Sequence, residues 1–368
     1  MGLALLLSLA SCTHDSDSAT GPVVDPVVDP EGPVVPPTAY NFVVPSNFPS
    51  PQPAPADNPL TVEGVALGRQ LFYEKALSVD NTLSCGSCHR QELAFTDGLA
   101  RARGVNGAQS PRSSMSLANL AWEPKLTWDG AASTLEAQAR IPLENPVEMH
   151  QRLSAGVARL QQTSTYPALF RKAFGSSTIT ESNTLKALAQ FERTLVSSNS
   201  RYDQFRRGNR AALSSFEQQG LVLFTTHPNG ILRGGNCGDC HSGDLQTNNT
   251  FSNNGLDLTF TDLGVGQLTG KTTDNGKFRV PSLRNIALTA PYMHDGRFTS
   301  LEQVVDHYNE HVVLASPNID PLMLSTTNDP SQASFTLDLT TDEKAKIVAF
   351  MKTLTDTTFV HDRRFAKP

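Results

Sequence analysis

Two copies of one short motif specify the chemistry of this sequence most clearly. They are Cys85-Gly86-Ser87-Cys88-His89 and Cys237-Gly238-Asp239-Cys240-His241. The spacing C-x-x-C-H is typical of covalent haem c attachment, in which both thiols form thioethers to the porphyrin and the adjacent histidine binds the iron. The sequence therefore predicts two haem c groups, one-electron chemistry and maturation outside the cytoplasm.

Other uses of these cysteines fit the sequence less well. Zinc ribbons place their two C-x-x-C pairs about 15–20 residues apart, whereas nearly half of the chain separates these two pairs. A structural disulfide set is also disfavoured, because four cysteines belong to the haem motifs and the fifth, Cys12, has a separate use.

Cys12 follows an apolar run, residues 2–10, that is too short to span a bilayer and is typical of the apolar region of a signal peptide. The ending Leu-Ala-Ser-Cys resembles a bacterial lipobox, whose cysteine is acylated. We therefore expect residues 1–12 to be a lipoprotein signal peptide. Its acylated Cys12 becomes the first residue of the mature protein and tethers it to the outer membrane on the periplasmic side. A plain secretory signal is the alternative.

Residues 13–57 are rich in Pro, Asp, Ser and Val and show no helical or strand period. This composition predicts a semi-extended tether. The formal net charge of −6 argues against nucleic acid as a partner and leaves small molecules or another protein. Membrane contact is expected only through the lipid anchor.

The body of the chain repeats itself. Gly68 and Phe72 precede the first haem motif as Gly220 and Phe224 precede the second, with the same 13-residue spacing from phenylalanine to cysteine. An offset of 166 carries residues 115–121 onto 281–287, 129–130 onto 295–296 and 135–136 onto 301–302, and residues 191–195 also match 350–354. We therefore expect a mainly α fold of two tandem cytochrome c-like domains with long loops, 58–208 and 209–368.

Local patterns place three of the helices. The first is expected to begin near Thr61, the helix before the second haem motif at Ser215-x-x-Gln218, and the last at the capping box Thr340-x-x-Glu343. Apolar residues at helical spacing predict the core positions, which are Val65, Leu71, Phe72, Ile347, Val348, Met351 and Leu354.

The two halves differ where a sixth iron ligand would be expected. At the position that matches His294, the first half has Trp128. No histidine lies between His89 and Trp128, and the only methionine there is Met115, inside the repeated segment. An iron with an open face binds and activates a small oxidant such as peroxide. This difference between the halves predicts an enzyme rather than a non-catalytic electron carrier.

Several motifs, in order, carry a family resemblance. The run Trp128-Asp129-Gly130, the run 145–149 (NPVEM), the second haem motif and the runs 280–285 and 288–296 resemble the bacterial di-haem cytochrome c peroxidase and MauG superfamily, over roughly residues 58–360. Residues 40–42, 56–59 and 112–117 resemble its MbnH-type branch, in which a MauG-like enzyme oxidises a tryptophan of a partner protein. The resemblance implies a peroxidase-type oxidoreductase that reacts with hydrogen peroxide and oxidises a protein reductant through high-valent haem intermediates.

The resemblance also implies roles for single residues. Trp128 matches the tryptophan that lies between the haems and carries electrons. Glu148 matches the distal carboxylate, which takes a proton from the near oxygen of peroxide and returns it to the leaving oxygen. Gln138 matches a distal glutamine that positions peroxide or water.

The second haem needs a sixth ligand. The candidates in the sequence are Met293, His294, His307, Tyr308 and His311. Chemistry alone favours methionine or histidine. The family position instead falls on Tyr308, where the peroxidases carry methionine and the MauG-like enzymes carry tyrosine. In the alternative, Tyr308 only packs and His307 or His311 binds the iron.

The family further holds one calcium ion between the haems. The resemblance places backbone oxygens of Thr289 and Pro291 on it, with Ser113 in place of the usual asparagine. A hydroxyl is a weaker calcium ligand than an amide carbonyl, although oxygen still suits the ion.

Two other functions remain open from the sequence. A cytochrome c peroxidase would draw electrons from a small periplasmic redox protein, either a cytochrome c or a cupredoxin. A non-catalytic di-haem electron carrier would use neither open iron nor peroxide. A high-spin, five-coordinate ferric haem at rest would exclude the carrier.

Overall fold

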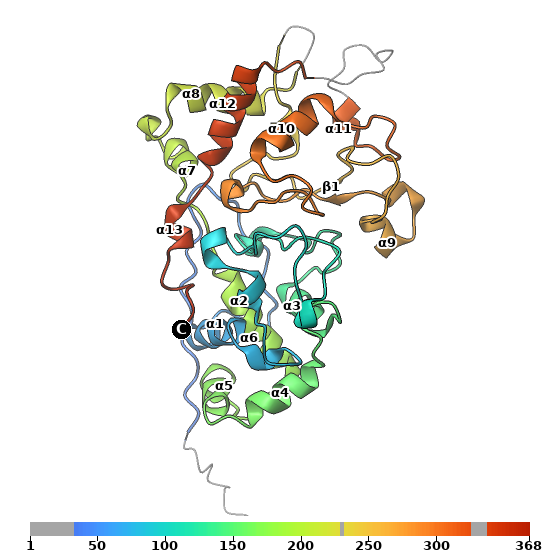
Figure 1. Cartoon of the computed structure of the whole chain (residues 1–368). Helices are drawn as coiled ribbons and strands as arrows, with labels where there is room; N and C mark the ends of the chain where they lie inside the picture. The colour runs from blue at the N-terminus through green and yellow to red at the C-terminus, as the bar shows by residue number, and fades with distance from the viewer. Residues whose placement is uncertain (1–32, 229–231, 325–336) are drawn as a thin grey trace, which may run out of the picture. The chain divides into compact units, whose positions relative to one another are not determined.

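The computed structural model describes residues 33–228, 232–324 and 337–368. The chain divides into two units, Met1–Val35 and Pro36–Pro368, and the second contains every helix and strand of the described residues. It is mainly helical, with one small antiparallel sheet in which β1 (Phe251–Ser252) pairs with β2 (Phe278–Arg279) (Figure 1). Phe251 lies opposite Arg279 in this sheet. The predicted mainly α class is therefore confirmed.

The elements follow the chain in one series of α-helices, with short 3-10 helices between them. The α-helices are α1 (Val62–Phe72), α2 (Cys85–Cys88), α3 (Leu135–Glu144), α4 (Leu153–Gln161), α5 (Tyr166–Phe174), α6 (Glu181–Arg193), α7 (Arg201–Arg206), α8 (Ser215–Thr225), α9 (Val265–Thr269), α10 (Leu301–Glu310), α11 (Pro321–Leu324), α12 (Thr341–Lys352) and α13 (Thr357–Val360). The 3-10 helices are η1 (Lys75–Leu77), η2 (Gln91–Leu93), η3 (Val105–Gly107), η4 (Leu120–Trp122), η5 (Arg210–Ala212), η6 (Cys237–Asp239), η7 (Thr272–Asp274) and η8 (Ile286–Leu288).

The amino-terminal predictions fall mostly outside these residues. The expected signal peptide (1–12), with Cys12, and the first part of the expected tether lie outside the described residues. Within the described part of the chain, no helix is both long and apolar enough to cross a bilayer.

Each half is built on one close helix crossing, α1 on α6 and α8 on α12. A Cβ on Gly68 would lie 1.9 Å from the carbonyl oxygen of Ala187, and a Cβ on Gly220 would lie 1.9 Å from that of Lys346. Only glycine permits such an approach. The matched glycines of the two halves therefore do the same packing, and the duplication seen in the sequence extends to the helix crossings.

The repeated segments also keep their local geometry. Asn119 and Asn285, which match in the repeat, both adopt a left-handed conformation, with φ of 63° and 61°. Asparagine tolerates this conformation better than most residues. Isolated antiparallel bridges then form at Leu126–Ala132 and at Tyr292–Phe298, and α3 and α10 begin at equivalent positions after the caps Thr134 and Ser300. The offset of 166 thus holds from residue 119 to the interior of α3.

The predicted helix starts are correct in two of three cases. Thr61 caps α1, and Thr340 with Glu343 forms the capping box of α12. The expected start at Ser215-x-x-Gln218 is wrong by one residue, because Ser214 is the cap and Glu217 closes its box. The anionic Glu217 suits a helix amino terminus better than neutral Gln218 and also pairs with Arg201.

Two apolar cores lie behind these helices. The first gathers buried residues from α1, α3, α4, α5 and α6, and the second gathers them from α7, α8, α10 and α12. The predicted core positions Leu71, Phe72, Ile347, Val348, Met351 and Leu354 are all buried, and Val65 packs against the first core. The last residues of the chain depart from the expected division, because Phe359, Val360 and Phe365 belong to the first core.

The described end of the expected tether packs on the body instead of standing free. Phe48 is buried, the indole Nε1 of Trp122 donates to the carbonyl of Pro49 at 2.8 Å, and Gln52 N donates to the carbonyl of Ala121 at 2.8 Å. We call residues 36–57 the strap. Their proline content suggested a free linker, but Phe42 and Phe48 supply apolar surface that the body buries.

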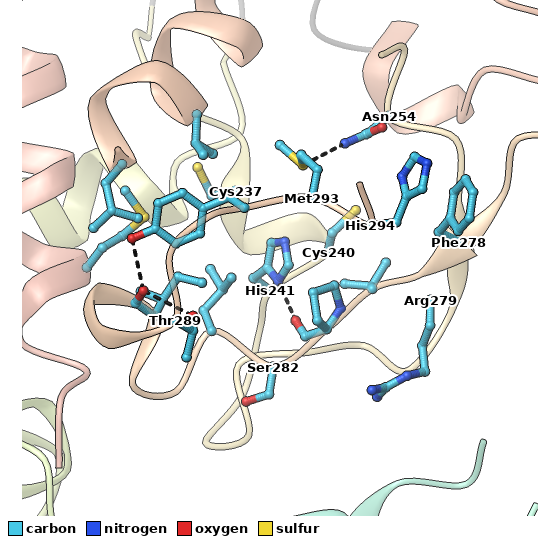
Figure 2. Close-up of a pocket in the computed structure, with 18 of the residues that line it drawn as sticks. Cys237, Cys240, His241, Asn254, Phe278, Arg279, Ser282, Thr289, Met293 and His294 are labelled. Atoms are coloured by element: carbon cyan, nitrogen blue, oxygen red, sulfur yellow. Dashed lines mark hydrogen bonds between the residues drawn. The ribbon is translucent and has the colours of Figure 1, made fainter. Parts of the chain in front are cut away.

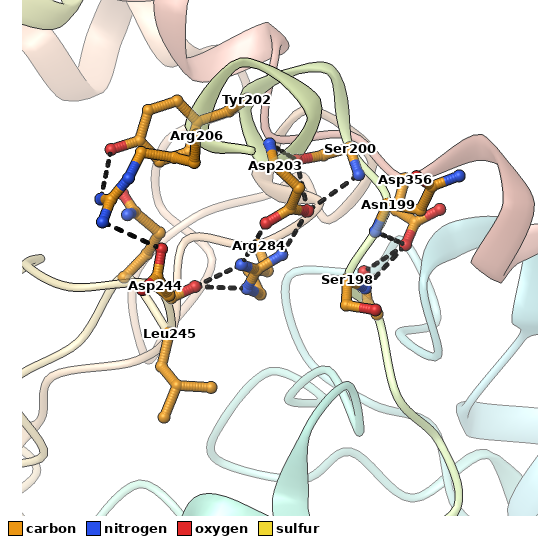
Figure 3. A network of polar contacts seen from close by, with 12 residues as sticks. Ser198, Asn199, Ser200, Tyr202, Asp203, Arg206, Asp244, Leu245, Arg284 and Asp356 are labelled. Carbon is orange, nitrogen blue, oxygen red and sulfur yellow. Dashed lines mark hydrogen bonds and ion pairs between the residues drawn. The ribbon is translucent and has the colours of Figure 1, made fainter. Parts of the chain in front are cut away.

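A polar network fixes the chain where one half passes into the other (Figure 3). Arg284 makes a bidentate ion pair with Asp203, with both side chains at most 2% exposed. Burial alone would raise the pKa of Asp203, but the Arg284 guanidinium holds it below its usual value. The Asp356 carboxylate accepts from the backbone N–H groups of Ser198 and Asn199 at 2.9 and 2.8 Å.

Ser197 is held by both repeats. Asn119 Nδ2 donates to its carbonyl at 3.0 Å, and Asn285 Nδ2 donates to its hydroxyl, also at 3.0 Å. The two asparagines are equivalent residues of the duplication. Ser197, which connects the two halves, is therefore held by an equivalent asparagine hydrogen bond from each half.

Candidate active site

The first C-x-x-C-H motif forms the short helix α2. The Ser84 N–H donates to Ser87 Oγ at 3.0 Å at its start, and His89 Nδ1 lies 2.8 Å from the carbonyl oxygen of Phe95 at its end. That bond places the ring proton on Nδ1 and leaves Nε2 with a free lone pair. Burial lowers the pKa of His89, while the Phe95 carbonyl partly offsets the effect. The neutral imidazole is the form that binds iron.

The second motif repeats this arrangement on η6. His241 Nδ1 lies 3.1 Å from the carbonyl oxygen of Pro281 and 3.4 Å from that of Gln246. Burial lowers its pKa to about 4. The four motif cysteines are free thiols, and burial raises the pKa of each. Both sulfur atoms of each motif are thus available for thioether bonds.

A cavity opens over the second motif (Figure 2). Cys237, Cys240 and His241 line it together with Met293 and His294. The rest of the wall is mainly apolar and includes Phe224, Leu283, Val305, Ile347 and Met351. A cavity with apolar walls, two thiols and a histidine with a free Nε2 fits a haem c group.

The cavity separates the candidates for a sixth ligand. Met293, His294 and Tyr308 line it, whereas His307 and His311 are not among its lining residues. His307 Nε2 lies 3.1 Å from the carbonyl of Asn254, and His311 Nδ1 lies 3.1 Å from that of Asp306. His294 stacks on Phe278, with ring centroids 3.8 Å apart.

Asn254 connects two of the remaining candidates. Its Nδ2 donates to the Tyr308 hydroxyl oxygen at 3.0 Å and to the Met293 sulfur at 3.6 Å. Burial raises the pKa of Tyr308 to about 12, the Asn254 bond lowers it, and the thiols of Cys240 and Cys237 raise it further. Tyr308 thus lines the same cavity as both thiols, with its hydroxyl held by a donor.

Trp128 enters the same cavity from the first half. Its Nε1 donates to the carbonyl of Ser113 at 3.0 Å, and its own carbonyl accepts from Arg279 N at 2.8 Å. Met115, from the same loop as Ser113, also lines the cavity, and the Met115 carbonyl raises the pKa of His89. The loop 113–116 therefore reaches from the His89 side to the cavity of the second motif, and Trp128 is bonded to this loop.

Glu148 lies near the first motif. Its carboxylate accepts from Asn145 Nδ2 at 2.8 Å and raises the pKa of both Cys85 and Cys88. Burial raises the pKa of Glu148 itself, which makes its carboxylate a stronger proton acceptor than an exposed one. Gly104 lets its own loop lie directly against the backbone of Val147 and Glu148, because a Cβ at residue 104 would lie 2.2 Å from the carbonyl oxygen of Val147.

Gln138 is half-buried in the first turn of α3, the helix that leads to Asn145 and Glu148. Among the described residues, the Glu148 carboxylate accepts from Asn145, and no hydrogen bond joins it to the Gln138 side chain. Their joint action on peroxide stays a prediction.

Comparison with known proteins agrees with this geometry. A family model described as di-haem cytochrome c peroxidase matches residues 62–211. Methylamine utilization protein MauG of Methylorubrum extorquens is 40% identical over 259 residues, which cover 70% of this chain and 71% of that protein. Cytochrome-c peroxidase IdrP1 of Denitromonas iodatirespirans is 34% identical over 345 residues, which cover 85% of this chain and 87% of that protein.

A solved structure gives the same result. A MauG-like protein associated with microbial copper homeostasis matches with a TM-score of 0.80 and 37% identity, over 90% of this chain and 99% of that one. The chain belongs to the di-haem cytochrome c peroxidase and MauG family. As a member, it is an oxidoreductase of the peroxidase type, and the family implies haem c as its cofactor.

Within this MauG-family protein, the repeat reveals a difference that sequence reasoning missed. The offset that matches α3 to α10 carries Tyr308 onto Pro142, which lies inside α3. A proline side chain has no atom that binds iron. The equivalent of the Tyr308 hydroxyl is therefore absent from the first half. Aligning α3 with α10 beyond residue 136 would have revealed this in the sequence.

Three buried charged residues near the motifs were also missed. Arg279 and Glu123 form an ion pair at the cavity wall, with side chains only 5% and 6% exposed. Glu192 on α6 is 5% exposed and raises the pKa of Cys85, so it lies near the first motif. It matches Met351 in the duplication, and Met351 lines the second cavity. The burial of Glu192 could not be seen in the sequence, because a charged residue in an amphipathic helix is normally expected on the exposed face.

The expected calcium ligands of this MauG-family protein all lie at the cavity over the second haem motif. Ser113, Thr289 and Pro291 all line the cavity, and Ser113 Oγ donates to the carbonyl of Met293 at 3.1 Å. Among the described residues, no group of three or more His, Cys, Asp or Glu side chains could hold a metal ion. A calcium ion bound by backbone and hydroxyl oxygens stays a prediction.

Proposed function

We propose that this protein reduces hydrogen peroxide at the haem of Cys85, Cys88 and His89 and oxidises a partner protein by way of the haem of Cys237, Cys240 and His241. The substrate on the partner is a tryptophan side chain. A bound haem supplies an iron that accepts peroxide and can hold oxidising equivalents. Family membership supports the peroxidase class, and the resemblance of residues 40–42, 56–59 and 112–117 to the MbnH-type branch is the reason for proposing a protein substrate.

The observation that carries the proposal is the inequality of the two halves at matched positions. The second half presents Tyr308 and His294 to its cavity, whereas the first half has Pro142 and Trp128 at the matching places. One haem can thus take a sixth ligand from the chain, and the other keeps a face open. An electron carrier needs no such difference.

The chain's own residues assist the reaction in separate ways. Glu148, with its raised pKa and its bond from Asn145, removes the proton from the near oxygen of peroxide and returns it to the leaving oxygen. Gln138 positions the peroxide. Trp128, bonded to the loop 113–116, passes single electrons, because its indole is the side chain there that is most easily oxidised. Asn254 orients the Tyr308 oxygen toward the second site.

A second candidate function follows from Met293. Its sulfur lines the same cavity and accepts from Asn254 at 3.6 Å. A thioether ligand favours ferrous iron, whereas a phenolate favours the oxidised metal. With Met293 bound, the protein would act as a cytochrome c peroxidase that takes electrons from a small cytochrome c or a cupredoxin.

Domain limits, location and calcium complete the proposal. We assign residues 58–208 and 209–368 to the two haem domains, the site of action to the periplasm, and a lipid anchor at the outer membrane to Cys12. One calcium ion binds at Ser113, Thr289 and Pro291. The periplasm agrees with the export that covalent haem attachment requires.

Electron paramagnetic resonance of the purified holoprotein tests the proposal. We expect one high-spin and one low-spin ferric haem at rest. Tyr308→Phe should change the low-spin signal, whereas Met293→Leu should leave it unaltered; the reverse result would favour the second candidate. Glu148→Gln should slow the reaction with peroxide at least about tenfold, equivalent to ~1.4 kcal/mol.

Glu144→Gln serves as the matched control, because Glu144 lies in the same segment but its side chain is 41% exposed. Two low-spin haems in the wild type, without any spectral response to peroxide, would refute the proposal. Mass gain on tryptophan of a protein encoded next to this one, seen only with peroxide, would identify the substrate.

A further inference from the structure

The chain has two tryptophans, and the proposed function uses one. The other, Trp122, is 3% exposed and ends η4, six residues before Trp128. With Phe48 and Ala121 it forms a small apolar cluster, apart from the two main cores. A buried tryptophan outside the cores needs its own explanation.

On one side, this cluster lies next to the segment that contacts His241, the histidine of the second haem motif. Leu245 packs against the cluster, and the carbonyl of the next residue, Gln246, lies 3.4 Å from His241 Nδ1. Ser282 Oγ donates to the Leu245 carbonyl at 2.6 Å and holds this segment in place. A short path of packed atoms and one hydrogen bond thus leads from His241 toward Trp122.

On its outer side, the cluster meets the strap. The Trp122 ring lies 5.2 Å from that of Phe48, edge to face, and 5.9 Å from that of Phe42. Phe42 also lines a second pocket, together with Tyr40, Val196 and Arg207. Trp122 therefore lies between the second haem site and a pocket formed by the strap and the body.

We propose that Trp122 is a redox relay through which a reductant on the strap side delivers electrons to the second haem. This inference rests on the proposed function and adds the route by which electrons enter. Each peroxide that becomes two waters takes up two electrons and two protons. The Trp122 indole loses one electron to the oxidised second site and regains one from the reductant, twice per peroxide, and no bond forms or breaks at the relay.

The surroundings of Trp122 determine the form of its oxidised state. Its Nε1–H donates to the Pro49 carbonyl, which is not a base, so the oxidised indole keeps its proton as a cation radical. Arg284 lies over the Phe48 ring at 4.6 Å, but its charge is compensated by the bidentate Asp203 pair. Glu123, next in sequence, is paired with Arg279. No unpaired charge of these groups faces the ring.

The test compares Trp122→Phe with Trp122→Tyr in the holoenzyme, with hydrogen peroxide alone as the probe. Both substitutes have the same ring, but only tyrosine is readily oxidised. In the wild type, freeze-quenched samples should show a tryptophan cation radical that narrows in protein grown on ring-deuterated tryptophan. Trp122→Phe should lose this radical signal. It should also lengthen the lifetime of the peroxide-oxidised protein at least about tenfold, equivalent to ~1.4 kcal/mol. Trp122→Tyr should shorten the lifetime relative to Trp122→Phe, but less than the native indole does, because oxidation of a phenol must also release its proton.

The control is Phe48→Leu, which loosens the same cluster but keeps the indole. If packing alone matters, the three variants will behave alike, and the relay is refuted. If wild-type protein shows no spectral reaction with peroxide, the proposed function fails and the relay with it. A normal reaction with peroxide, combined with an unchanged lifetime in Trp122→Phe, refutes the relay alone.

Peptide mapping keeps the inference testable if the variants do not fold. Wild-type enzyme given excess peroxide without a reductant should acquire oxygen on Trp122. Oxygen on other side chains, with Trp122 intact, would overturn the relay.

Discussion

Glu192 should make the stability of this protein fall as the pH rises. Its carboxyl group is 5% exposed on α6, and among the described residues its Oε2 has no hydrogen-bond partner. Burial raises its pKa from the usual 4.5 to about 8; Arg193 lowers it in part, and Glu136 raises it. At neutral pH the folded protein therefore holds a neutral acid, whereas the unfolded chain releases its proton.

The size and the sign of the effect follow from these values. Because the folded pKa is the higher one, the contribution to stability is complete below about pH 4.5, falls as the pH rises, and is lost by about pH 8. A difference of about 3.5 pKa units, at ~1.36 kcal/mol each, gives an upper limit of about 5 kcal/mol. Glu192→Gln removes the titrating proton and should remove this loss.

The assay is chemical unfolding of the holoprotein at pH 5 and pH 8. Wild-type protein should lose up to about 3.5 kcal/mol more of its free energy of unfolding between these values than Glu192→Gln, because part of the titration lies outside this pH range. Glu144→Gln is the control, because the Glu144 side chain is 41% exposed, and it should follow the wild type. Parallel pH profiles for wild type and Glu192→Gln would refute the idea that the folded protein keeps Glu192 neutral.

Three other changes have expected outcomes. Gly68→Ala places a Cβ 1.9 Å from the Ala187 carbonyl oxygen and should destabilise the protein by more than about 2 kcal/mol in denaturant unfolding, whereas Ala66→Gly on the exposed face of α1 should cost only about 1 kcal/mol. Asp203→Asn leaves the Arg284 charge buried without its partner and should cost about 3–5 kcal/mol in the same assay; a loss below 1 kcal/mol would contradict the pairing. Asn254→Leu removes the donor to the Tyr308 oxygen and should lower the reduction potential of the second haem in a spectroelectrochemical titration, and an unchanged potential would argue against Tyr308 as its ligand.

Sequence reasoning succeeded where spacing or repetition carries the information. Covalent chemistry dictates the haem motif, and the duplication dictates matched glycines, because Gly68 and Gly220 meet the same kind of helix crossing. Helix caps were found for α1 and α12, since a cap is a local interaction. Before α8, two overlapping patterns fit, and only the charge of Glu217 and its pairing with Arg201 distinguished them.

Contacts between distant segments were not visible in the sequence. The strap was taken for a tether because its prolines dominate the pattern, whereas burial of Phe48 depends on Trp122 and Arg284, which lie more than 70 residues away. The bond from Asn254 to Tyr308 likewise joins residues 54 positions apart. Pairings of this kind depend on how the loops fold over the cavity, and neither periodicity nor spacing encodes them.

The tail of the chain has a consequence for biogenesis. Phe359, Val360 and Phe365 fill the interior made by residues that leave the ribosome nearly three hundred positions earlier. The core of residues 58–208 therefore lacks part of its apolar packing until residues 359–365 have been synthesised. A chain that lacks residues 359–365 would expose the apolar surface that these side chains cover, and such a surface is a target for chaperones and proteases.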